Sequence, residues 1–130
     1  MRALLDANVV IRHLTGEPKG QARRATRLLG GDHELILTDV VLAEIVYVLE
    51  SFYRLPREEV ATTAASLIAL PSIVTADPIV LLRALELYGT LRRDFGEMHL
   101  AAMAERLGVG RVVSFDHDLD GVASVERVGP

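Results

Sequence analysis

The sequence predicts an α/β fold in which a mostly parallel sheet is flanked by helices. Short apolar runs, each long enough for one strand, alternate along the chain with longer segments in which apolar residues recur at helical spacing. Strands separated by helices form parallel pairs, because a parallel connection needs a crossover. The 130 residues suit one domain, residues 1–130, with a single core.

Local signals predict where each element begins and ends. Gly16, Gly30 and Gly108 each follow a helical pattern and mark its end. Asp39 and Asp77 are expected to cap the helices that follow them. In chain order we expect a strand at 3–5, helices at 8–14 and 18–29, a strand at 34–38, helices at 40–53 and 56–70, a strand at 72–75, helices at 78–91 and 94–107, and strands at 111–115 and 124–128.

The composition excludes several classes of function. The absence of cysteine excludes disulfides, thiolate catalysis and Cys-ligated metal sites, and it suits the reducing cytoplasm in which we expect the protein. No apolar segment has the length of a membrane span, and the N-terminus lacks a signal-peptide pattern, so no membrane association is expected. The net charge of −4 argues against a generally basic surface, but local basic patches remain open.

Two aspartates follow apolar strands directly. Asp6 ends the run at 3–5, and Asp116 comes after the run at 111–115. In open parallel sheets ligands bind at the carboxyl ends of the strands, and a charge there is costly unless something pairs with it. We therefore expect both carboxylates to hold a cation or to take part in chemistry.

Glu44 lies on the helix expected at 40–53, where every neighbour within four positions is apolar. One alternative is an exposed side chain that reaches solvent. Because a helix this apolar has few positions that face solvent, we predict that Glu44 is a buried and paired carboxylate.

Asp94 and Glu97 have the spacing of a capping box at a helix start. Capping can account for one of the two carboxylates. Glu97 remains a candidate for metal contact, because its helix face continues into Leu100 and Ala101.

The aspartates at 116, 118 and 120 resemble the front of a calcium-binding loop, but Arg127 stands where that loop needs an acidic residue. We therefore favour Asp116, and after it Asp118, as ligands of another kind of site. The four histidines show no mutual metal-ligand spacing and receive no catalytic role. The arginines can contact phosphates or form solvated helix faces; they are Arg23, Arg24, Arg27, Arg92 and Arg93.

Four segments together resemble the PIN-domain ribonucleases, particularly the toxin subunits of VapBC toxin–antitoxin systems. They are LLDANVVI at 4–11, DVVLAE at 39–44, DFGEMHLAA at 94–102 and SFDHDL at 114–119. No single segment is specific, but their order and spacing match over nearly the whole chain. The resemblance implies an α/β/α sandwich with a central parallel sheet, an acidic pocket that binds Mg²⁺ or Mn²⁺, and metal-dependent endonucleolytic cleavage of RNA.

The resemblance also assigns residues. Asp6, Glu44 and Asp116 fall on acidic positions of the family, and Glu97 stands where members commonly have Asp. The expected catalytic residues are Asp6, Glu44, Glu97 and Asp116; the expected metal ligands are Asp6, Glu97 and Asp116, with Asp94 and Asp118 as further candidates; the expected substrate contacts are Asn8, Ser114, Arg92 and Arg93. Clustered carboxylates suffice for this chemistry, because Mg²⁺ prefers oxygen ligands and can activate a water for attack on a phosphodiester.

The expected partners are RNA, a VapB-like antitoxin and a second copy of the chain. The helices at 40–53 and 60–70 carry more apolar residues than one buried stripe requires, which predicts an exposed interaction patch. Two alternatives remain. A receiver-like phosphoacceptor domain needs a late lysine, whereas the only lysine is Lys19, and a PIN-like module without activity would serve protein interaction alone. The sequence does not predict which RNA is cut or how many metals act.

Overall fold

The computed structural model describes all residues from Met1 to Pro130. Its elements in chain order are β1 (Arg2–Leu4), α1 (Ala7–Thr15), α2 (Lys19–Leu29), β2 (Glu34–Ile36), α3 (Asp39–Ser51), α4 (Arg57–Ile68), β3 (Ile73–Val74), α5 (Pro78–Leu91), α6 (Phe95–Leu107), β4 (Arg111–Val113), the 3₁₀ helix η1 (His117–Gly121) and β5 (Glu126–Val128). The predicted alternation of helices and strands is confirmed, although the strands are shorter than expected.

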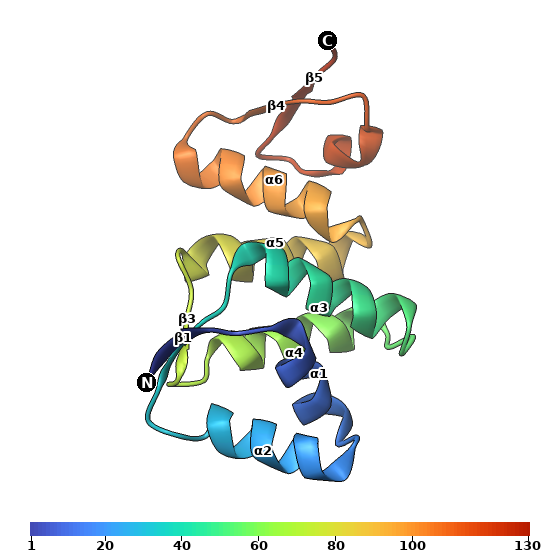
Figure 1. Cartoon of the computed structure of the whole chain (residues 1–130). Coiled ribbons are helices and arrows are strands. Elements are labelled where there is room, and N and C mark those ends of the chain that lie inside the picture. Colours follow the sequence, from blue (N-terminus) through green and yellow to red (C-terminus); the bar gives the residue numbers. More distant parts are fainter.

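All strand pairs are parallel, as the alternation predicted. The strands fall into two sheets, one with the order β1-β2-β3 and one formed by β4 and β5. Figure 1 shows α1 and α2 at one end of the molecule and β4 and β5 at the other, beyond α6. The carboxyl ends of β1 and β4, which carry the two predicted aspartates, therefore belong to different sheets.

The core lies between the three-stranded sheet and the helices that cover one of its faces. It is a continuous cluster of 29 buried residues, to which β2 contributes Leu35 and α3 and α5 contribute such side chains as Leu42 and Leu81. Full burial of a side chain of this size contributes about 2 kcal/mol. No helix is both long and apolar enough to span a membrane.

The other face of this sheet is largely uncovered. Leu4, Ile36 and Val74 lie side by side across the three strands, and Leu4 is 74% exposed. The strand predicted at 3–5 is therefore buried on one face only, and β1 is an edge strand that pairs only with β2. Leu5, which is 4% exposed, is the residue of this run that enters the core.

Of the two predicted aspartate caps, the one on α5 is confirmed and the one on α3 is not. Asp77 caps α5 as predicted, accepting a hydrogen bond from the Ile79 backbone. For α3, the predicted cap Asp39 is wrong, since Thr38 accepts the bond from the Val41 backbone. Asp39 is instead the first residue of the helix, which leaves its carboxylate available for a contact outside α3.

Candidate functional site: an acidic cluster at α6 and η1

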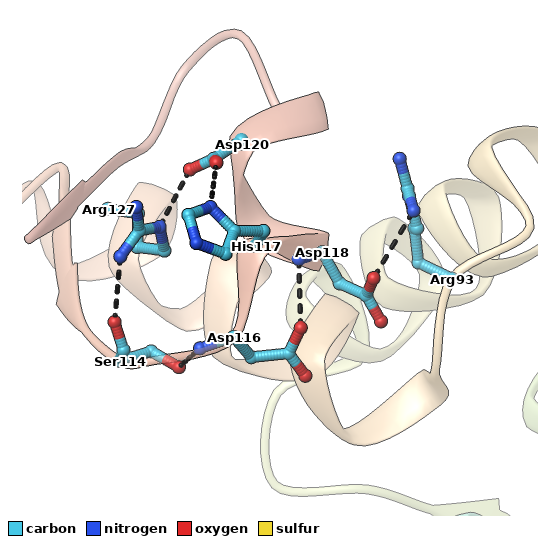
Figure 2. Close-up of polar contacts among 7 residues, drawn as sticks. All are labelled: Arg93, Ser114, Asp116, His117, Asp118, Asp120 and Arg127. Atoms are coloured by element: carbon cyan, nitrogen blue, oxygen red, sulfur yellow. Dashed lines mark hydrogen bonds and ion pairs between the residues drawn. The ribbon is translucent and has the colours of Figure 1, made fainter. Parts of the chain in front are cut away.

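Asp116 sits at the turn between β4 and η1, where its side chain fixes the local backbone. Its Oδ1 accepts a hydrogen bond from the Asp118 backbone at 2.9 Å, and its own backbone N–H donates to the Ser114 hydroxyl at 2.9 Å (Figure 2). This is an aspartate cap on a short helix, which the residue types predict locally. Asp116 is exposed, so its second carboxylate oxygen remains open to solvent and to ligands.

Asp118 lies beside Asp116 and binds an arginine from another part of the chain. Arg93, between α5 and α6, donates to the Asp118 carboxylate at 3.2 Å (Figure 2). This contact ties η1 to the start of α6. Arg93 was predicted to contact substrate, and in this arrangement its charge already has a partner.

Asp120 is turned away from these two carboxylates. In Figure 2 it faces His117 and Arg127, which contact it at 2.8 Å each. The hydrogen bond with His117, and after it that with Arg127, holds the pKa of Asp120 below its ordinary value. The three regularly spaced aspartates of this segment therefore separate into two that lie together and one that stabilises the loop.

Glu97 is the half-buried member of the group. It lies in the first turn of α6, and its Oε2 is buried without any hydrogen-bond partner. Its pKa is raised, chiefly by desolvation and then by the negative charges of Asp116, Asp94 and Asp118. The charges of three nearby carboxylates thus act on Glu97, and no cation is among the groups that shift its pKa.

Asp94 occupies the position before α6, but its side chain makes no capping hydrogen bond. The carboxylate lies over Gly96, where an added Cβ would come within 3.1 Å of Oδ2. The predicted capping function is therefore wrong for Asp94. Glu97 does not complete a capping box either, since Oε2 has no partner. Both carboxylates are consequently available for a cation.

Asp6 lies at the carboxyl end of β1, directly before α1. It is exposed and makes no capping hydrogen bond, and Asn8 is exposed on the first turn of the same helix. Asp6 is not among the charges that raise the pKa of Glu97. The acidic cluster is therefore defined as Glu97 with the three carboxylates whose charges act on it, Asp94, Asp116 and Asp118, and Asp6 is not counted in it.

Glu44 is exposed, so the predicted burial is wrong. Helix α3 buries a stripe that includes Ile45 and Leu49 and turns the opposite stripe to solvent, where Val40 and Tyr47 flank Glu44 at helical spacing. Val40 is 78% exposed. The error has a simple cause: an apolar helix surface need not be buried, so apolar neighbours in the sequence did not determine the environment of Glu44.

A profile of the PIN domain matches residues 3–125, which is nearly the whole chain. The chain belongs to the PIN-domain family. A search of curated proteins gave no significant match. PIN domains are typically metal-dependent nucleases, and the α/β fold with parallel strands agrees with this membership.

The acidic cluster of this PIN domain fits a hard divalent cation in its chemistry. The donors are carboxylate oxygens, and the orphaned Oε2 of Glu97 has the desolvated charge that a cation would offset. No three acidic or histidine side chains converge into a closed ligand set. Mg²⁺ needs only one or two direct carboxylates, with waters in the remaining positions, so an open set is sufficient.

Two contacts near the site were not predicted. His99, two residues after Glu97, pairs with Asp39 at 2.8 Å and so joins α6 to the start of α3. The sequence offered a weak signal, since both residues lie in the segments that carry the family resemblance. The second contact is made by Arg57, which reaches the Arg93 carbonyl and supports the loop before α6. Nothing in the local sequence around Arg57 indicated this contact.

Of the remaining predicted substrate contacts, Ser114 already makes hydrogen bonds within the protein, whereas Arg92 is exposed. Ser114 accepts from the Asp116 backbone with its hydroxyl and from Arg127 with its carbonyl. Arg92 is exposed in left-handed conformation, with φ of 57°, at the end of α5. The lysine that a receiver-like site would need is absent from the cluster, because Lys19 lies on α2 at the other end of the molecule (Figure 1).

Proposed function

We propose that this PIN domain is a metal-dependent endoribonuclease that acts as the toxin of a VapBC-type toxin–antitoxin pair. The observation that carries the proposal is the buried, partnerless Oε2 of Glu97 among three further carboxylates. Such an arrangement is unfavourable by itself and becomes favourable when a cation neutralises it.

Glu97 and Asp116 are the proposed principal ligands, with Asp94 and Asp118 as further candidates. Bound Mg²⁺ or Mn²⁺ would supply an activated water and offset charge on the phosphate oxygens. Arg93 orients Asp118, and the Asp118 backbone in turn orients Asp116. Asp6 and Glu44 stay in the proposed catalytic set as exposed carboxylates, Asp6 directly before α1 and Glu44 on α3, whose contribution depends on bound RNA.

The nuclease proposal is tested with purified protein and a panel of tRNA, rRNA and mRNA fragments, with Mg²⁺, with Mn²⁺ and with excess EDTA. We expect cleavage with metal and none with EDTA. The matched variants are Asp116→Asn, which removes a proposed ligand, and Asp120→Asn, which changes the same loop without touching the cluster. Cleavage that persists in EDTA would contradict the proposal.

The proposed partners are an antitoxin segment and a second copy of the chain. Helix α3 supports this with exposed Val40 and Tyr47, and the turn that follows exposes Phe52. The patch predicted on the helix at 60–70 is wrong, because the large apolar residues of α4 are buried. Growth arrest on expression, relieved by the gene encoded upstream, tests the toxin assignment.

A PIN-like interaction module without catalysis is the second candidate. The lack of a closed set of three metal ligands favours it. The two functions differ in a single measurement, since only the nuclease loses RNA cleavage in Asp116→Asn while retaining its fold by circular dichroism.

A further inference from the structure

Helices α1 and α2 and their connections, residues 7–31, form a helical hairpin. It carries the largest group of cations without carboxylate partners in the molecule. Elsewhere most arginines are paired, as Arg57 is with Glu50 and Arg106 with Asp77. The basic residues of the hairpin make no ion pair; they are Arg12, Lys19, Arg23, Arg24 and Arg27. Glu17 is the one acidic residue between positions 7 and 31. The hairpin is therefore positive in a chain whose net charge is −4.

The cations form an ordered row because of how α2 packs. Ala22, Ala25 and Leu29 are buried and fix one face of α2 in place. Lys19, Arg23 and Arg27 follow one another at intervals of four residues, so they lie along one side of the helix about 6 Å apart. All three are exposed.

Two grooves run along the hairpin. The larger, of about 610 Å³, is lined by the three cations of this row together with His13 and Thr26, which contact each other at 2.7 Å. The smaller, of about 300 Å³, lies on the other side and includes Asn8, Arg12, Gln21 and Arg24. Both grooves thus combine positive charge with neutral hydrogen-bonding groups.

We propose that this hairpin is an anchoring surface for the phosphate backbone of single-stranded RNA, separate from the acidic cluster. The inference rests on the proposed nuclease function. Unpaired guanidinium and ammonium groups suit phosphates, which accept their charge-assisted hydrogen bonds. The hairpin, residues 7–31, contains no Phe, Tyr or Trp, and its only aromatic ring is that of His13, so its cations favour contact with the phosphate backbone over sequence readout.

The position of α2 makes the row formed by Lys19, Arg23 and Arg27 an anchor and not part of the reaction centre. Figure 1 shows α1 and α2 at the end of the molecule opposite β4 and β5. Contacts that bind the substrate and the transition state equally well lower KM without changing kcat, and phosphate contacts far from the cleaved bond are expected to act in this way. Loss of the hairpin cations should therefore raise KM and leave kcat unchanged.

The test measures binding by fluorescence anisotropy, in EDTA so that RNA stays intact, with a labelled RNA of about 20 nucleotides. The test variant is K19Q/R23Q/R27Q. Affinity for single strands falls with salt at a slope of about −0.7 per phosphate contact, so the variant should lose about 2 from the slope. Near 0.1 M salt we expect at least a tenfold weaker Kd. Oligo(U) and oligo(A) should bind the wild-type protein within about threefold of each other.

The matched control is R54N, which removes an exposed arginine elsewhere in the chain. Arg54 has φ of 55°, a backbone conformation that asparagine tolerates well. Circular dichroism melting of each variant checks the fold, which exposed Gln residues on a helix should preserve. An equal loss of RNA affinity in R54N and in the triple variant would overturn the inference.

The same variants also show whether the hairpin binds RNA or an acidic protein segment. They further distinguish failure of the anchoring inference from failure of the nuclease proposal. A triple variant that keeps its RNA affinity and salt slope but loses binding to poly-glutamate would show that the hairpin binds an acidic peptide, which overturns the inference. With Mn²⁺ added, unchanged KM for the variant overturns it as well. Wild-type protein that shows the predicted binding but no cleavage refutes the nuclease and leaves the anchoring surface standing.

Discussion

At the scale of single residues, Glu97 shows how environment gives a common side chain an uncommon property. Three other carboxylates stand near it, and its buried Oε2 has no donor. A hydrogen-bonded carboxylate of η1, Asp120, has its pKa moved in the opposite direction. The difference comes from which partners the fold supplies, since the two side chains have the same ionising group.

The first prediction concerns the stability of metal-free protein with Glu97→Gln. This change removes a desolvated charge and its repulsion with the other carboxylates, so the melting temperature should rise at neutral pH. The folded-state pKa of Glu97 is raised above 4.5, so the native state binds the extra proton and the wild type loses stability as pH rises through that pKa. The advantage of the variant should therefore be present near pH 7 and shrink towards pH 4, as measured by melting in EDTA. Glu59→Gln, on α4, is the control and should show no such trend, because this side chain is exposed and makes no ion pair.

A second prediction at this scale compares Asp94→Asn, Glu97→Gln and Glu97→Asp. Asp94 makes no capping hydrogen bond, so its replacement should leave stability within about 0.5 kcal/mol of the wild type. Glu97→Gln should lower cleavage or Mn²⁺ affinity much more than Asp94→Asn does, and Glu97→Asp should retain substantial activity. The measurement is RNA cleavage against Mn²⁺ concentration. Normal cleavage by Glu97→Gln together with an inactive Asp94→Asn would reverse the assignment.

At the scale of elements, α3 separates a structural face from a candidate functional one. Its buried stripe joins the core, while Glu44 stands between exposed Val40 and Tyr47 on the other side. The contact between Asp39 and His99 sets the start of α3 against α6. The helix therefore has a fixed inner face and an outer face available to RNA or to a partner.

The outer face yields the third prediction. Glu44→Gln should change the free energy of unfolding by less than about 0.5 kcal/mol, because the side chain is exposed and makes no ion pair. If Glu44 is a catalytic carboxylate, the same variant should lose RNA cleavage. Glu58→Gln, also exposed but on α4, is the control and should cleave normally. Full activity in Glu44→Gln would remove this residue from the catalytic set.

At the scale of the whole molecule, the division of the strands into two sheets determines which faces are buried. The three-stranded sheet packs against helices on one side and exposes the row Leu4, Ile36 and Val74 on the other. Acidic and basic groups are also separated, with the carboxylate cluster at α6 and η1 and the unpaired cations on α1 and α2 (Figure 1). A polyanion approaching the molecule therefore meets attraction at one end and repulsion at the other until a cation occupies the acidic cluster.

The fourth prediction compares the stability lost on replacing Leu4, the last residue of β1, and Leu5, which directly follows it. Leu5→Ala should destabilise the protein by about 2–5 kcal/mol, because it leaves a cavity in the core. Leu4→Ala should cost less than about 1 kcal/mol, since this side chain is 74% exposed. Urea denaturation of both variants provides the comparison. Similar losses for the two would show that the outer face of the sheet is covered in solution.

Features that depend on near neighbours in the chain could be predicted from the sequence. The helix ends at Gly16 and Gly108 were predictable, because both residues adopt the left-handed conformation that glycine tolerates best. The position of Asp116 at the end of a strand was predictable too, because an apolar run directly precedes it. Hydrogen bonds of helices and turns close within about four residues, so short patterns contain the necessary information.

Which of these residues lie near one another depends on how the helices and strands pack. Glu97 and Asp116 lie near each other because α6 and η1 pack together, whereas β1, which Asp6 follows, belongs to another sheet than β4. The exposure of Glu44 and the contact of Asp39 with His99 likewise depend on which side of α3 faces α6. Burial and electrostatic environment arise from residues far apart in the sequence, and local patterns carry no record of those contacts.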